Sequence, residues 1–162
     1  MILSHKLRLA GLILLPLFAF PHVGGAATTP FNAMAGVWSG DGAMTMSGGA
    51  QERLRCRAQY SVGGGGNEMQ LNLRCASESY KFDLVGQVEY QHGTISGSWN
   101  EATRNAAGTI SGQAVGDHIR AAARGNNFSA NLSLTTRGGR QTVAIQPQGT
   151  DIRDVSIALN RR

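Results

Sequence analysis

The chain has 162 residues, of which 41% are hydrophobic and 15% are charged, and its formal net charge is +5. This mild excess of basic residues lacks the dense clusters typical of nucleic-acid-binding proteins, and it argues against that function. The length fits one domain.

The first 27 residues have the features of a signal peptide. A short basic region with Lys6 and Arg8 precedes an apolar stretch over 9–20, and small residues follow it. We expect cleavage near Ala26 or Ala27 and a periplasmic or secreted protein. The apolar stretch is too short to span a membrane comfortably, so no membrane anchor is expected.

The chain that follows the signal peptide is expected to be a linker over 28–35 and a single domain over 36–162. The first predicted strand begins at Gly36, and it places Trp38, Met44 and Met46 on one face.

A hairpin built around the only two cysteines follows. Apolar and polar residues alternate on both sides of a glycine run over 63–66, as in a β-hairpin. Folding the hairpin between Gly65 and Gly66 places Cys56 opposite Cys75. Two cysteines in an exported chain most simply form a disulfide, so we expect a structural cross-strand bridge.

Further strands with one apolar face follow at regular spacing. Their apolar sets fall within 80–90, 95–99, 108–115, 119–123, 128–134, 143–145 and 152–159. A change of parity between Ile152 and Val155 predicts a bulge at Arg153–Asp154. No sustained helical period occurs after the signal peptide, which makes the domain all-β.

About ten strands joined by short turns predict an antiparallel up-and-down meander barrel, with a two-sheet β-sandwich as the alternative. A membrane barrel would need an apolar outer face. The outward positions here are arginine, glutamine, asparagine, serine and threonine. We therefore expect a soluble monomer that does not span a membrane.

The opening Gly36-Val37-Trp38 and the short-loop meander resemble the calycin superfamily of lipocalin-like barrels. That resemblance implies that Trp38 lies across a closed barrel end and that a basic residue of the last strand packs over its ring. Arg153 is the expected partner. The mature chain also looks like a small exported protein family common in alphaproteobacteria, which implies location and fold rather than an activity.

The residues offer no catalytic machinery. Only His92 and His118 remain after the signal peptide, and neither lies in a metal-ligand spacing. No nucleophile elbow is present. We expect no enzyme activity, no metal and no cofactor.

An interior ligand pocket is the first functional hypothesis. Inward glycines remove side-chain volume from the core, and barrels of this kind hold small apolar ligands in such space. The candidate pocket residues are Tyr60, Tyr80, Gly86, Tyr90, Gly97, Trp99 and Gly112. The alternative is that these glycines mark bends of the barrel.

A surface interaction is the second hypothesis. The outward arginines of the hairpin, with one more placed opposite by its register, form a candidate anion-binding site for an anionic glycan or lipopolysaccharide: Arg53, Arg55, Arg57 and Arg74. The alternative is a solvated face neutralised by Glu52, Glu68 or Glu78. A third possibility is a protease inhibitor that inserts the segment 28–35 into an enzyme.

Overall fold

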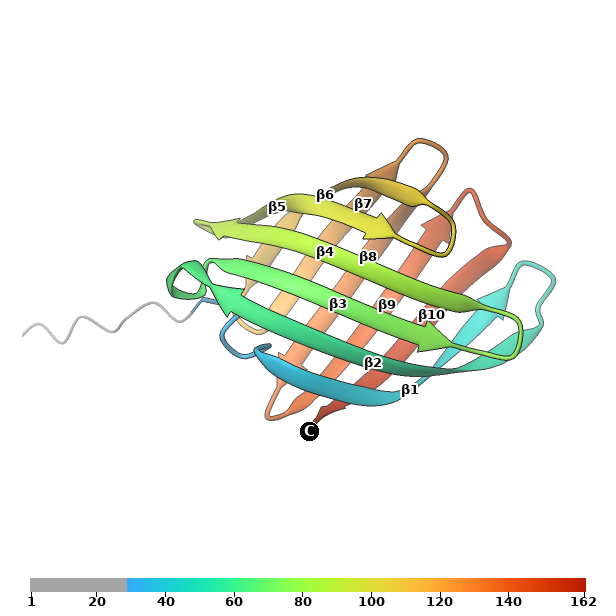
Figure 1. Cartoon of the computed structure of the whole chain (residues 1–162), viewed down its shortest axis with the longest axis horizontal. Coiled ribbons are helices and arrows are strands. Elements are labelled where there is room, and N and C mark those ends of the chain that lie inside the picture. Colours follow the sequence, from blue (N-terminus) through green and yellow to red (C-terminus); the bar gives the residue numbers. More distant parts are fainter. Residues whose placement is uncertain (1–28) are drawn as a thin grey trace, which may run out of the picture.

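The computed structural model describes residues 29–162. The expected signal peptide, with its cleavage site near Ala26 or Ala27, lies outside the described residues. Ten strands and a short 3-10 turn follow one another along the described chain (Figure 1). They are β1 (Gly36–Met46), β2 (Gln51–Gly63), η1 (Gly64–Gly66), β3 (Glu68–Ala76), β4 (Lys81–Gln91), β5 (Thr94–Glu101), β6 (Ala106–Val115), β7 (His118–Gly125), β8 (Ser129–Arg137), β9 (Arg140–Gln148) and β10 (Ile152–Arg161).

The strands form one closed antiparallel barrel. Each strand pairs with the next in sequence, and β1 pairs with β10 to close the sheet (Figure 1). Closure satisfies the backbone of both terminal strands and leaves no sheet edge. The predicted ten-strand meander barrel is therefore confirmed, and the sandwich alternative is wrong. Residues 29–162 include no helix long and apolar enough to cross a membrane.

The cysteine hairpin has the predicted register. Cys56 lies opposite Cys75 and Tyr60 lies opposite Leu71 across β2 and β3. The two cysteines form a disulfide with their Cα atoms 4.1 Å apart, and both are buried. The bridge is part of the inner face, as its parity predicts.

The predicted bulge near the start of β10 is also confirmed. Thr45 of β1 pairs with Asp154, but the next residue of β1, Met46, pairs with Ile152. Arg153 is left without a partner in the ladder. This extra residue brings Ile152 and Val155 onto the same inner face despite their different parity.

The hydrophobic core lies inside the barrel and is densest on β1, β2 and β10. Trp38, Met44, Leu54 and Leu159 are almost completely buried there. Outward residues of the same strands are largely exposed, so period-two alternation places apolar side chains inside and polar side chains outside.

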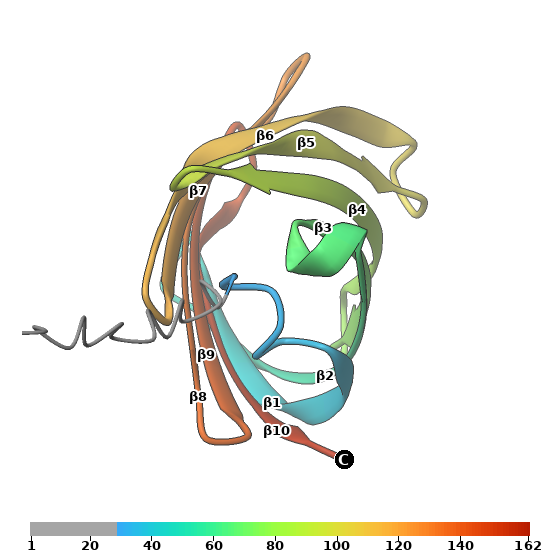
Figure 2. The ribbon, with the colours of Figure 1, turned by 90° about the vertical axis from the view of Figure 1, so that its left-hand side faces the viewer.

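The segment 29–35 is part of the barrel, so its prediction as a linker is wrong. Phe31 and Met34 are almost completely buried. The segment turns inside the barrel opening beside the β2–β3 connection (Figure 2), where the Thr29 hydroxyl donates to the carbonyl of Gly66 over 2.6 Å. Burial of its two large apolar residues explains why the segment packs rather than extends.

Reducing the disulfide should lower stability without abolishing the fold. The bridge joins residues 19 positions apart, and the loop-entropy model assigns such a loop about 3 kcal/mol. We expect the melting temperature, followed by circular dichroism, to fall by roughly 10 °C when reductant is added.

The double variant Cys56→Ser/Cys75→Ser is the matched control, because reductant should leave its melting temperature unchanged. An equal melting temperature for the oxidised and reduced wild-type protein would contradict a stabilising role.

Candidate functional site

One end of the barrel is closed around Trp38. Its indole Nε1 donates to the carbonyl of Met34 over 2.7 Å, and its ring meets Tyr60 edge-on. The guanidinium of Arg161 lies 4.6 Å from the centre of the Trp38 ring. The basic residue expected over this ring is thus Arg161, and the prediction of Arg153 is wrong.

The barrel register explains this correction. Arg161 is directly opposite Trp38 in the β1–β10 ladder, whereas Arg153 lies in the bulge at the other end of β10. Arg153 pairs instead with Asp154 over 3.1 Å. Arg161 has the same parity as Leu159 and Ile157, which face inward. This alternation in the sequence was sufficient to identify Arg161 as the basic residue on the Trp38 side of β10.

Arg161 also fastens the N-terminal segment to the last strand. Its two terminal nitrogens donate to the carbonyls of Ala33 and Ala35. Phe31 of the same segment packs edge-on against Tyr90, with ring centres 6.2 Å apart. Segment 29–35, Trp38 and Arg161 together form what we call the closed end.

A polar row lies inside the barrel near the closed end. The Tyr60 hydroxyl donates to Oε1 of Gln141 over 2.6 Å, and Nε2 of Gln141 donates to the Thr136 hydroxyl over 2.9 Å. Burial raises the pKa of Tyr60 well above its usual value. Tyr60 is therefore a neutral hydrogen-bonding group that its neighbours already satisfy.

The three predicted pocket glycines differ in the space around them. A Cβ at Gly97 would lie 2.0 Å from the carbonyl oxygen of Gln87, and one at Gly112 would lie 2.2 Å from that of Arg120. Both positions therefore need glycine because the neighbouring strand approaches closely. At Gly86 the nearest atom would be 3.7 Å away, on Leu71. Only Gly86 leaves usable room.

Trp99 occupies the inner face beside Gly86. The ladder places Gly86, Trp99, Gly108 and Gly125 in one row across β4 to β7. The indole packs against Gly108 and Gly125, and it meets Phe128 edge-on, with ring centres 5.5 Å apart. Its buried Nε1 has no hydrogen-bond partner among residues 29–162. That atom lies against Gly108. Trp99 therefore contributes apolar packing surface rather than a hydrogen-bond donor.

The inner wall on β3 and β4 keeps contact with solvent. Leu71, Leu73, Phe82 and Leu84 point inward, opposite in parity to the outward polar residues, yet all are only partly buried. In a completely filled core such side chains would be fully buried. This wall is apolar and adjoins Gly86, where a Cβ would fit at ordinary contact distance.

The barrel end away from the closed end carries rings and a cation. Tyr80, just before β4, stacks on Phe82, whereas Tyr90 lies at the other end of the same strand. The predicted pocket tyrosines are therefore not together. The Arg104 guanidinium lies 4.9 Å from the centre of the Phe82 ring and 3.6 Å from a carboxylate oxygen of Glu101.

Glu101 fixes the turn that carries Arg104. Burial raises the pKa of this carboxyl, but hydrogen bonds from the backbone of Asp83, from Thr103 and from the backbone of Arg104 outweigh it and lower the pKa overall. Glu101 is therefore an ionised structural group.

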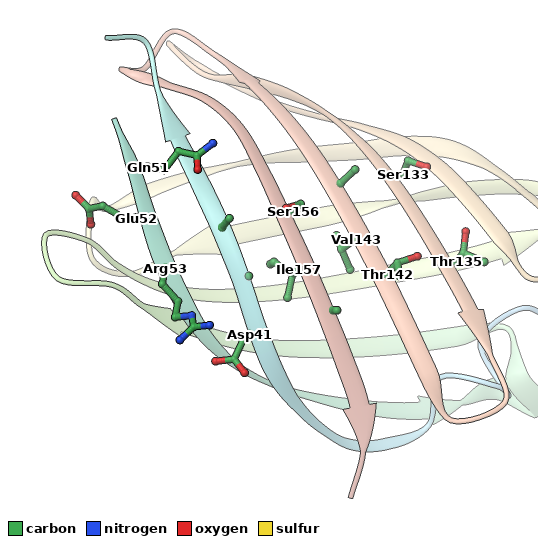
Figure 3. Close-up of a pocket in the computed structure, with 14 residues that line it drawn as sticks. Asp41, Gln51, Glu52, Arg53, Ser133, Thr135, Thr142, Val143, Ser156 and Ile157 are labelled. Carbon is green, nitrogen blue, oxygen red and sulfur yellow. The ribbon is translucent and has the colours of Figure 1, made fainter. Parts of the chain in front are cut away.

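The outer surface has two shallow hollows. One, of about 700 Å³, lies over β8, β9, β10 and β1 and is bordered by Ser133, Thr142, Ser156 and Arg53 (Figure 3). Another, of about 650 Å³, shares Ser133 with it and reaches across β7 to β6. The side chains on both floors are mostly small. Of the predicted pocket residues, neither hollow includes any except Gly112, which borders the second.

The predicted arginine site has the expected placement. Arg57 lies directly opposite Arg74. Arg74 forms an ion pair with Asp83 over 3.2 Å, a partner that the sequence did not single out. Glu52 instead accepts hydrogen bonds from Ser77 and from the backbone of Ser79, which lower its pKa.

Within residues 29–162, no group of three or more histidine, cysteine or carboxylate side chains is arranged to hold a metal ion. His118 lies in a surface hydrogen-bond chain between Thr135 and Arg120. His92 has a positive φ of 48° in the β4–β5 turn. The absence of enzyme activity remains a prediction.

Two solved structures share this fold. Rv2717c from M. tuberculosis superposes with a TM-score of 0.64 and 12% sequence identity, covering 80% of this chain and 93% of its own. The S-type phycobiliprotein lyase CPES from Guillardia theta gives 0.60 and 8%, covering 82% and 89%. No protein-family model and no curated protein matches the chain. The chain is therefore a closed ten-strand barrel whose fold resembles these two structures.

Glycine replacements test the assignment of space on the inner wall. Gly97→Ala and Gly112→Ala should each lower the free energy of unfolding by at least about 2 kcal/mol, because the new Cβ meets backbone. Gly86→Ala should leave it unchanged or raise it by up to about 1 kcal/mol. Urea titrations measure all three, and equal losses would contradict the assignment.

Replacing Arg161 tests the closed end. Arg161→Gln should lower the free energy of unfolding by about 1–2 kcal/mol, since it removes a cation–π contact and two hydrogen bonds at an exposed residue. Arg153→Gln should change it by less than about 0.5 kcal/mol. The same urea titrations compare the two variants. A larger loss of stability in Arg153→Gln than in Arg161→Gln would contradict the assignment of Arg161 as the partner of Trp38.

Proposed function

We propose that this chain is a non-catalytic binding module that holds a small apolar or amphipathic ligand inside its barrel. The observation that carries the proposal is the partly accessible apolar wall of β3 and β4 inside a barrel that its own N-terminal segment closes at one end. Apolar ligands bind in such lined interiors with a few polar groups to orient them.

The missing side chain of Gly86 favours the middle of this wall as the binding position. A ligand there would contact the side chains of Leu71 and Ile110, which lie 3.7 and 4.0 Å from the position of a Cβ at Gly86. Trp99 would form the adjoining wall.

Entry is proposed from the end away from Trp38. The closed end is blocked by Phe31 and Met34, which are almost completely buried. At the other end, Phe82 and Tyr80 offer ring surface and Arg104 offers a cation. This combination suits an amphipathic molecule whose polar or anionic group remains near solvent.

The proposed location is the periplasm or the exterior of the cell. A buried disulfide accords with an oxidising compartment. The inhibitor alternative gains no support, because segment 29–35 is packed against its own barrel and is not free to enter an enzyme.

Titration with the apolar fluorescent probe N-phenyl-1-naphthylamine tests the proposal. Wild-type protein should bind about one equivalent, and Gly86→Phe should weaken binding at least tenfold because the new ring occupies the proposed position. The matched control is Ser98→Phe, which adds the same ring to the exposed outer face of β5.

The control should bind the probe as the wild type does, and both variants should keep the wild-type circular dichroism spectrum. Absence of stoichiometric binding, or equal losses in the two variants, would refute an interior site. Native mass spectrometry of protein from its own source then identifies any co-purified ligand.

A further inference from the structure

Three exposed arginines form a straight row on the outer face of β2. Arg53, Arg55 and Arg57 alternate with buried core residues, and the row extends over roughly 14 Å at the usual rise of a strand. None of the three makes an ion pair with a carboxylate of residues 29–162. Their charge is therefore exposed to whatever approaches this side of the barrel.

Neighbouring strands add further cations to the same face. Arg57 lies between Arg74 on β3 and Ser39 on β1, and Ser39 accepts a hydrogen bond from Nε of Arg162. Lys81 on β4 continues the row that begins at Arg55. The arginine face, as we define it, consists of Arg53, Arg55, Arg57, Arg74, Lys81 and Arg162.

The charge of the molecule is concentrated on this face. Three carboxylates lie among or beside the six cations: Asp41 opposite Arg55, Asp83 paired with Arg74, and Glu52, which borders one outer hollow together with Arg53. The face with these groups therefore carries +3, and residues 29–162 together have 13 basic and 10 acidic residues, or +3. The rest of the described chain thus has no net charge.

The charge on the outer surface of β3 and β4 also differs between the two ends of these strands. Glu68 and Glu89 lie opposite each other at the closed end, and Glu68 is six residues, or roughly 20 Å, from Arg74. The outer surface of these strands thus changes sign along its length. Such an arrangement orients the molecule toward an anionic surface.

Arginine chemistry favours phosphate as the anion. A guanidinium presents a planar fork that binds phosphate oxygens in pairs, which lysine does not do. Arg57 and Arg74 are like charges directly opposed, at a cost of about 0.2–1 kcal/mol that a shared anion removes. Five of the six cations are arginine.

The shape of the arginine face suits a broad anionic surface as its partner better than a single polyanionic chain. Five of the cations spread over the adjacent strands β2, β3 and β4, and Arg162 follows the end of β10. They do not follow a groove; of the six, Arg53 alone borders either of the two hollows described above. The next outward pair beyond Arg57 and Arg74 is Gln59 and Asn72, and the outward positions of β2 and β3 carry no aromatic ring on which bases would stack. We propose that the arginine face docks on the phosphate headgroups of an anionic phospholipid membrane.

Vesicle co-sedimentation tests this docking. The probes are vesicles of phosphatidylcholine alone and of phosphatidylcholine with phosphatidylglycerol, at physiological ionic strength. Wild-type protein should partition at least tenfold more strongly onto the anionic vesicles, and high salt should release it. The triple variant Arg53→Ser/Arg55→Ser/Arg57→Ser should lose at least tenfold of this binding, since each basic residue near such a surface contributes about fivefold.

The matched control removes three other exposed arginines, as Arg124→Ser/Arg140→Ser/Arg153→Ser, and so has the same net charge. It should stay within about threefold of wild type. Equal losses in both triple variants would overturn a defined face, and equal binding to both vesicle types would overturn electrostatic docking. Retention on heparin or on an acidic peptide without vesicle binding would assign the face to a soluble polyanion instead.

Discussion

The pairing of β1 with β10 is the interaction on which the rest of the structure depends. It turns a ten-strand meander into a closed barrel, and it places Arg161 directly over Trp38. Arg161 then holds the backbone of segment 29–35, whose Phe31 fills the closed end. The first and last parts of the described chain thus meet at one site, which links barrel closure to the question of where a ligand can enter.

Alternation along each strand was enough to predict most of the fold. It gave the strand number, the hairpin register and the disulfide, because one-residue slips would move every core side chain outward. It also predicted the bulge at Arg153. It did not predict the packing of segment 29–35, whose short length and lack of periodicity gave no signal for burial. Nor did it predict the hydrogen bond between Tyr60 and Gln141, which are 81 residues apart in the sequence.

The candidate site was predictable only in part. Parity identified the inward glycines, but only the spacing between strands separates Gly86, which has room, from Gly97, which its neighbour's backbone crowds. Parity likewise gave the arginine row, whereas the ion pair of Arg74 with Asp83 required the β3–β4 register. The inner wall and the arginine face are on opposite sides of the same strands, so β2 to β4 join a proposed ligand site to a proposed docking surface.

The central claim is that the barrel keeps accessible apolar space beside Gly86. Crystals pressurised with xenon test this most directly, because xenon occupies apolar cavities without needing polar contacts. The account predicts a xenon atom inside the barrel, between Leu71 and Ile110. Xenon found solely in the outer hollows, with the interior filled by side chains, would contradict it.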